Sequence, residues 1–281
     1  MPTYLVVDLP CLRVLEISSG VAALTAALLH ITFPQNTILN ITCRGEPSTQ
    51  IDFSNFSSVL VKNFLSSLVI RTLSFKYLDD RREGLEFYFW TTIIIQTSFF
   101  PSSLIPVQPQ LRLVLTWLSP KLHDYVEGST SAFDSMNFHF LTQLHISTEN
   151  YIDSQTWAKF FGRLPLLERV CAKTGSTHSF LKALVCEAKA AEKSRTGYRN
   201  VSLPGLRYIY LEGTIFFKTT PVDMLLDYFK ERCERNAEIQ VLYLVECLYI
   251  SSDDLERLKE IVLDVIWDGI GILGRRRLGL R

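Results

Sequence analysis

Histidine is the residue type in this chain that most readily ligates a metal or carries a proton near neutral pH, and the sequence has five. His139 and His145 bracket the segment FLTQL, which reads as a strand. Six residues of strand separate their backbones by about 20 Å, too far for one metal ion. We therefore expect ordinary loop and strand histidines and no metal site.

Nucleophiles and paired carboxylates offer little more. Ser176 lies close to His178, but a catalytic triad is assembled in space, and a turn leading into a helix explains Gly175–His178 better. Asp79-Asp80 belongs to a charged turn, and Asp253-Asp254 opens a predicted helix. No G-x-S-x-G elbow and no phosphate-binding P-loop occur. The sequence therefore predicts no catalytic site and no cofactor.

Composition points to a large globular core. Apolar residues make up 47% of the 281 positions, and 29 basic residues balance 29 acidic ones. A neutral chain gives no electrostatic case for nucleic acid or for an anionic membrane. The six cysteines form no C-x-x-C pair, and most lie in apolar runs as buried free thiols do. With no signal peptide and no unbroken apolar span, we expect a cytoplasmic or nuclear protein.

An internal repeat determines the fold prediction. LPCLRVLEI, LPLLERVCA and LPGLRYIYL share the pattern L-P-x-L-x-x-Φ-x-Φ, where Φ is hydrophobic, and each is followed by a glycine. The same skeleton without the proline recurs in FLTQLHIS and IQVLYLVEC, with weaker copies in ILNITC, VIRTLSF and LRLVLTW. The two close hydrophobic residues of each copy point into a core from a strand, since they are two positions apart. Stacked copies predict an α/β leucine-rich-repeat solenoid, horseshoe-like, with a parallel sheet on the concave side and helices on the convex side.

Helical patterns lie between these strands. We expect helices over 20–33, over 154–164 with Asp153 or Ser154 as N-cap, and over 178–193 capped by Thr177. Two more follow Pro221 and Ser252, the latter as N-cap. Residues 78–110 fit the repeat worst: YLDDRREG predicts a turn between two strands, followed by an extended segment and a proline-rich loop. We therefore expect one domain over 1–269, with an irregular insertion at about 78–110 and a capping module at about 221–269, and a disordered basic tail over 270–281 that contains Arg275–Arg277.

The strand residues between the inward pairs point to the opposite, partner-accessible face. Tyrosine is favoured at binding hot spots because it offers a large contact area at a small entropic cost. Three tyrosines on adjacent predicted strands therefore suggest a binding face, with loops or the tail covering these rings as the alternative. The candidate partner-binding residues are Tyr208, Tyr210, Glu212, Tyr243, Arg169, Lys173, His145 and Glu16.

The closing segment, 225–269, resembles the end of the leucine-rich-repeat portion of the fungal F-box-like proteins. A helix ending in E-R-x-x-R-x-A precedes the last full strand, and a C-x-x-I turn, a short helix and D-V-x-W-D-G follow it. The matching residues here are Glu231, Arg232, Arg235, Ala237, Cys247, Ile250, Asp264, Val265, Trp267, Asp268 and Gly269. LPCLRVLEI, FPQNTILNITC and FFGRLPLLERV are similar to that family as well.

The resemblance implies the substrate-recognition part of an F-box-type ubiquitin-ligase receptor, whose repeats bind an unidentified target protein. The stretch ahead of the first repeat holds no F-box, so a Skp1-type adaptor is a partner only if an F-box is encoded upstream. Two alternatives stay open: a stand-alone leucine-rich-repeat scaffold with no ligase link, and an enzyme with a site built from scattered residues. We expect a monomer with an exposed apolar edge at its N-terminal end, because only MPTYLVVD precedes the first repeat.

Overall fold

The computed structural model describes residues 6–44, 54–78, 83–94, 107–117, 138–147, 164–173, 177, 180–181, 184, 203–216 and 222–270. The chain divides into two compact units, residues 1–141 (unit 1) and 142–281 (unit 2). Several predictions fall outside the described residues: the helix over 154–164 with its cap, most of the helix over 178–193, Pro221, the turn at 79–82 and the basic tail with Arg275–Arg277.

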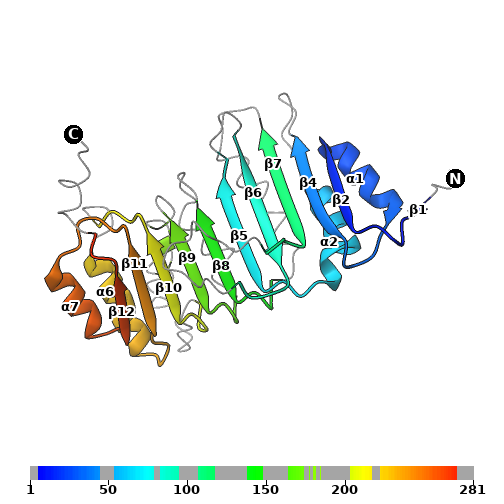
Figure 1. Cartoon of the computed structure of the whole chain (residues 1–281). Coiled ribbons are helices and arrows are strands. Elements are labelled where there is room, and N and C mark those ends of the chain that lie inside the picture. Colours follow the sequence, from blue (N-terminus) through cyan, green and yellow to red (C-terminus); the bar gives the residue numbers. More distant parts are fainter. Residues whose placement is uncertain are drawn as a thin grey trace. The chain divides into compact units, whose positions relative to one another are not determined.

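Unit 2 contains a parallel sheet of short strands (Figure 1). Its described strands lie side by side in the order β12-β11-β10-β9-β8, each hydrogen-bonded in parallel to the next. The strands are β8 (Gln143–Ser147), β9 (Arg169–Lys173), β10 (Tyr208–Glu212), β11 (Val241–Val245) and β12 (Asp264–Trp267). Helices α6 (Val222–Cys233) and α7 (Ser252–Lys259) connect the last strands.

The L-P-x-L motif forms a tight turn ahead of each strand. The amide of Leu167 donates to the carbonyl oxygen of Leu164 at 3.4 Å, and that of Leu206 donates to Leu203 at 3.0 Å. All four leucines are buried. These turns stack closely, since a Cβ on Gly205 would lie 2.9 Å from the carbonyl oxygen of Pro165. The repeat therefore specifies both the turn and the register of the strand that follows it.

The inward pairs predicted from the repeat are buried. Ile209 and Leu211 of β10 are fully buried, as are their register partners on the neighbouring strands. Those partners are Val170, Ala172, Leu242 and Leu244. Because residues alternate between the two faces of a strand, the intervening side chains all lie on the opposite face. The predicted parity of these strands is thus confirmed.

Unit 1 has a mixed sheet with the order β5-β6-β7-β4-β2. Strands β2 (Val14–Gly20), β4 (Ile38–Arg44) and β7 (Leu111–Trp117) are parallel, and β6 (Glu83–Trp90) is antiparallel to both β7 and β5 (Thr72–Tyr77). Helices α1 (Val21–His30) and α2 (Ser54–Asn63) pack against each other, and a short 3-10 turn, η1 (Leu65–Ser67), follows α2. A separate small ladder joins β1 (Val7–Asp8) to β3 (Ile31–Thr32).

The irregular segment predicted at about 78–110 is where the parallel order breaks. The expected hairpin is confirmed, because β5 and β6 pair antiparallel on either side of residues 79–82. Strand β6 then inserts between β5 and β7, and its core side chains Leu85, Phe87 and Phe89 are buried. Residues 95–106, the proline-rich part of the insertion, lie outside the described residues.

The fold is therefore mixed α/β with a mostly parallel sheet that is not closed into a barrel in the part of the chain described. This confirms the predicted α/β class and the mostly parallel sheet. No described helix is long and apolar enough to span a membrane.

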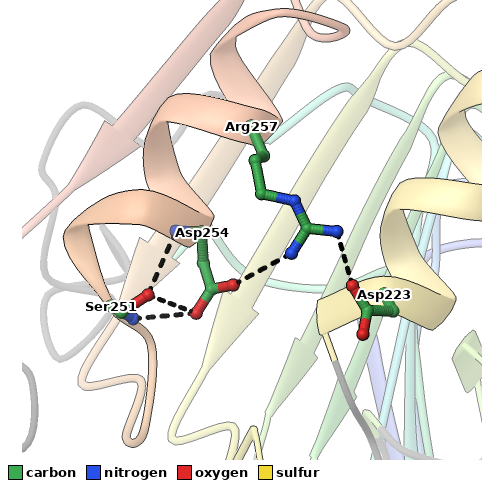
Figure 2. A network of polar contacts seen from close by, with 4 residues as sticks. All are labelled: Asp223, Ser251, Asp254 and Arg257. Atoms are coloured by element: carbon green, nitrogen blue, oxygen red, sulfur yellow. Dashed lines mark hydrogen bonds and ion pairs between the residues drawn. The ribbon is translucent and has the colours of Figure 1, made fainter.

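Two predicted helix caps are wrong. Ser251, one residue before the predicted Ser252, caps α7: its Oγ accepts a hydrogen bond from the amide of Asp254, whose carboxylate accepts from the amide of Ser251 in return (Figure 2). Ser252 is the first residue of the helix. Thr177 lies within a helix, and its hydroxyl is buried without a hydrogen-bond partner, so it is not an N-cap. Both segments offered several hydroxyl or carboxylate residues in a row, and sequence spacing does not choose among them.

Candidate functional site

Seven of the eight predicted partner-binding residues lie on one face of the unit 2 sheet. Several of them are paired in register on neighbouring strands: Arg169 of β9 lies beside Tyr208 of β10, and Lys173 of β9 lies beside Glu212 of β10. Tyr210 lies between Cys171 and Tyr243, and His145 lies beside Cys171. We call this surface the unit 2 face, formed by His145, Arg169, Lys173, Tyr208, Tyr210, Glu212 and Tyr243. The eighth residue, Glu16, is on β2 of unit 1 and does not belong to it.

The centre of the unit 2 face is aromatic. The rings of Tyr210 and Tyr243, on neighbouring strands, have centroids 5.9 Å apart and are tilted by 38°. Tyr210 is buried, whereas Tyr243 and Tyr208 are half-buried. Gln143 and Val245, also predicted to point outward, are buried too. The face is therefore partly covered, and its accessible aromatic area comes mainly from Tyr208 and Tyr243.

Arginine and tyrosine meet at the edge of this face near the amino ends of the strands. The guanidinium carbon of Arg169 lies 4.2 Å from the ring centroid of Tyr208, within cation–π range. Arg169 itself is exposed. Because the planar guanidinium lies over the ring while remaining accessible, a partner can stack on it or place a carboxylate against it.

The opposite edge of the face carries an ion pair. The Nζ of Lys173 lies 3.1 Å and 3.0 Å from the two carboxylate oxygens of Glu212. Burial of Tyr210, together with the adjacent Glu212 carboxylate, raises the pKa of the Tyr210 phenol well above its usual range. The phenol therefore stays protonated and able to donate a hydrogen bond at any physiological pH.

Between these groups lie a histidine and a cysteine that are held uncharged. Burial, and secondarily the positive charge of Lys173, lowers the pKa of His145 to about 4. Burial raises the pKa of Cys171 to about 12. A neutral imidazole and a protonated thiol on adjacent strands are poorly suited to nucleophilic catalysis, which requires the thiolate.

Sequence reasoning missed a second polar group, on the equivalent face of unit 1. Glu86 on β6 is almost fully buried, and its carboxylate lies 2.8 Å from the Nζ of Lys76 and 2.6 Å from Arg112. The Lys76 ammonium also lies over the ring of Tyr88, 5.6 Å from its centroid. We call Lys76, Glu86, Tyr88 and Arg112 the unit 1 cluster. The alternation of Glu86 and Tyr88 with phenylalanines along one strand could have indicated from the sequence that these two polar side chains share a face.

The charge state of the unit 1 cluster follows from its contacts. Burial alone would raise the pKa of Glu86, but hydrogen bonds from Lys76, Tyr88 and Arg112 outweigh it, and the pKa is lowered. The same carboxylate raises the pKa of both Lys76 and Arg112 against their own desolvation. Lys76, Arg112 and Glu86 are therefore all charged, Tyr88 stays protonated, and one carboxylate is shared by two cations. Glu16 is connected to it by register, since Glu16 pairs with Asn40 and Asn40 with Arg112.

The residues that carry the F-box-like resemblance hold the C-terminal end of unit 2 together. Arg232 is buried, Glu231 pairs with Arg235, and Cys247 is fully buried with its sulfur 3.5 Å from the carbonyl oxygen of Leu211. Asp268 accepts a hydrogen bond from the amide of Glu246 at 2.6 Å. Arg257 of α7 joins Asp223 at the start of α6, 2.5 Å away (Figure 2). Of the residues that carry the resemblance, Glu231, Arg232, Arg235, Cys247 and Asp268 therefore have structural roles.

One glycine pattern was missed. Gly269-x-Gly271-x-x-Gly274 follows β12 directly, and Gly269 has a positive φ of 78°. Such a pattern binds a dinucleotide only where it opens a helix after a strand. Gly271 and Gly274 lie outside the described residues, so the pattern supports no site. No group of three or more His, Cys, Asp or Glu side chains in the described ranges is arranged to hold a metal ion.

Comparisons with protein-family models, with curated proteins and with solved structures found no match to this chain.

Proposed function

We propose that the chain is a non-catalytic leucine-rich-repeat solenoid that binds another protein through the unit 2 face. The observation that carries this proposal is the alignment of seven chosen residues on one sheet face, in adjacent register rows. Protein interfaces concentrate binding energy in Tyr, Trp and Arg side chains, surrounded by polar groups that need not contribute much. The Tyr208, Tyr243 and Arg169 side chains, bordered by the Lys173–Glu212 pair, have that composition.

Several features favour binding over chemistry. Glu86 is paired with Lys76 and Arg112, and Lys173 is paired with Glu212. His145 is neutral, and Cys171 is protonated. An enzyme site instead usually contains groups with pKa values brought toward the working pH. The pKa values of His145 and Cys171 are instead shifted away from neutral pH, as is usual for desolvated structural groups.

The family resemblance adds a biological role to this proposal. It supports an assignment as the substrate-recognition part of an F-box-type ubiquitin-ligase receptor, with a Skp1-type adaptor engaged only through an F-box encoded upstream. The free cysteines among the described residues support a cytoplasmic or nuclear location. The stand-alone scaffold differs only in lacking the ligase link.

Affinity purification followed by mass spectrometry tests the binding proposal. The bait is the full chain, compared with Tyr243→Ala and Arg169→Ala, and with Lys230→Ala on the exposed side of α6 as the matched control. Truncating a hot-spot side chain that contributes about 2 kcal/mol of binding free energy weakens binding roughly thirtyfold. We expect at least one partner to be lost with both face variants and retained with the control. Partners that bind all four baits equally would refute the assignment of the face.

The ligase link needs its own measurement. The chain extended by its upstream coding sequence is tested for Skp1 capture and for a change in the half-life of the captured partner. Skp1 capture together with a shortened half-life supports the receptor role. A bound partner whose turnover does not change, with no Skp1, leaves the stand-alone scaffold.

A further inference from the structure

Strand β2 ends the unit 1 sheet in the part of the chain described, with β4 on one side only. Its core residues Leu15 and Ile17 are half-exposed, although their register partners on β4, Leu39 and Ile41, are fully buried. Val14 is 47% exposed. Among the described residues, the core of unit 1 is therefore incompletely covered at this end, as the sequence led us to expect.

The backbone of β2 is as open as its side chains. The carbonyl oxygen of Arg13 accepts a hydrogen bond from the amide of Ile38, so Arg13 directs its backbone toward β4. Alternate residues of a strand direct their peptide groups to opposite sides, so those of Val14, Glu16 and Ser18 point away from β4. An edge of this kind is a template for another strand.

Helix α1, which follows β2 directly, is exposed on the same end of unit 1 (Figure 1). It contains no Lys, Arg, Asp or Glu, and only Leu24 and Leu28 are buried. Its exposed side carries Ala22, Ala23, Ala26 and Leu29, the last 51% exposed. A helix that is apolar all round is normally buried. The open strand edge and the uncharged helix face are two independent signs of a missing cover.

We propose that a second copy of this chain covers this end, with β2 pairing antiparallel to β2 of the partner about a two-fold axis at Ile17. This register overlaps all of Val14–Gly20 and places the two Ile17 side chains opposite each other on the core side. Opposite residues of an antiparallel pair share a face, so both α1 helices lie on the same side of the joined sheet. The small alanine side chains allow those helices to approach closely. This dimer replaces the monomer expected from the sequence.

The distribution of charge on β2 and α1 favours a second copy as the partner and an axis at Ile17 as the register of the β2–β2 pair. Glu16 is the one charged side chain of Val14–Gly20, and α1 contains no Lys, Arg, Asp or Glu, so the strand and helix surface to be covered matches a second, equally apolar copy. An axis at Glu16 would place two carboxylates directly opposite, which destabilises a strand pair. An axis at Ile17 places Glu16 opposite Ser18. The two-fold contact uses the β2 edge of both copies, so this contact is closed and adds no third copy at β2.

Disulfide trapping tests the register in the full chain. The background is Cys11→Ser, because Cys11 is an exposed thiol. Directly opposite residues of a non-hydrogen-bonded antiparallel pair lie about 4.5 Å apart at Cα, within disulfide range. Under mild oxidation with oxidised glutathione, Ile17→Cys is expected to form a covalent dimer. Ser19→Cys is the matched control. Position 19 lies opposite Leu15 in this register, so we expect this variant to form little disulfide-linked dimer.

Sedimentation velocity over a wide range of concentration tests the dimer without a cross-link. Ser18→Pro removes an amide that points away from β4, so it blocks the new pairing and leaves the β4 ladder intact. Ala26→Lys adds a charge to the exposed face of α1, with Ser58→Lys on the exposed side of α2 as its control. We expect wild type and Ser58→Lys to double in mass with concentration, and Ser18→Pro and Ala26→Lys to stay monomeric.

Three outcomes overturn the proposal. These are wild type that sediments as a monomer at every concentration, disrupting variants that dimerise as wild type does, and equal cross-linking of Ile17→Cys and Ser19→Cys. Glu16→Gln distinguishes a second copy from a basic segment of another protein as the occupant of this edge. The second copy would dimerise as well or better without the Glu16 charge, whereas the basic segment would bind less tightly.

Discussion

The Nη2 of Arg232, on α6, donates a hydrogen bond to the carbonyl oxygen of Leu203 at 3.1 Å. The same nitrogen also donates to Leu206 at 2.9 Å, and Nε donates to Ala237 at 2.8 Å. Leu203 begins the L-P-x-L turn before β10 and has a positive φ of 51°. A fully buried guanidinium thus connects the end of one helix to the turn that starts an earlier strand. This contact gives the family-like Arg232 a physical role.

Replacing Arg232 is expected to destabilise unit 2. Arg232→Met removes the buried donor to the carbonyl oxygens of Leu203, Leu206 and Ala237, and we expect the free energy of unfolding to fall by about 3 kcal/mol. Arg232→Lys keeps the charge but not the planar fork, so it should recover only part of this loss. Urea denaturation measures both. Lys230→Met, exposed on the same helix, is the control, and a loss there equal to that of Arg232→Met would contradict the assignment.

The cap of α7 can be tested at two adjacent serines. Ser251→Ala removes the hydroxyl that accepts from the amide of Asp254, and it should cost about 1 kcal/mol of unfolding free energy. Ser252→Ala, one residue later, should change stability little because alanine is the better helix former. Thermal unfolding of the two variants side by side decides the position of the cap. Equal destabilisation would argue against Ser251.

The stability of unit 2 should fall as the pH drops below 6.5. The pKa of His145 is about 4 in the folded chain, so the unfolded chain binds this proton first. The loss begins near pH 6.5, levels off near pH 4 and reaches about 2 kcal/mol at pH 5. His145→Gln should reduce the difference in unfolding free energy between pH 7 and pH 5. His139→Gln, at an exposed histidine, is the matched control.

The unit 1 cluster should depend on the charge of Glu86. Glu86→Gln removes the carboxylate that Lys76 and Arg112 share, and because both cations are partly exposed we expect a loss of about 1.5 kcal/mol of unfolding free energy. Because the pKa of Glu86 is lowered, its contribution is present above the usual carboxyl pKa and disappears as the pH falls through the lowered value. Glu256→Gln, which breaks the exposed pair with Lys259, should cost well under about 1 kcal/mol. Urea titrations at pH 7 and pH 3 check both statements.

The strands of unit 2 were predictable because each L-x-x-Φ-x-Φ copy is local and carries its own turn. The same rule placed Tyr208, Tyr210 and Tyr243 on one face correctly. It assigned the cap of α7 to the wrong serine, since adjacent hydroxyl residues compete for the same amide and only backbone geometry decides. It missed the unit 1 cluster, because Lys76, Glu86 and Arg112 come from three different strands.

The amino-acid sequence by itself determined which residues face the core and which face outward, because that depends on a two-residue period within each strand. Only the tertiary structure decided which outward residues are neighbours. That follows from the order of strands in the sheet: β6 inserts between β5 and β7 and joins Glu86 to Arg112, whereas parallel stacking joins Arg169 to Tyr208. Strand order depends on contacts between residues far apart in the chain, and no local period encodes them.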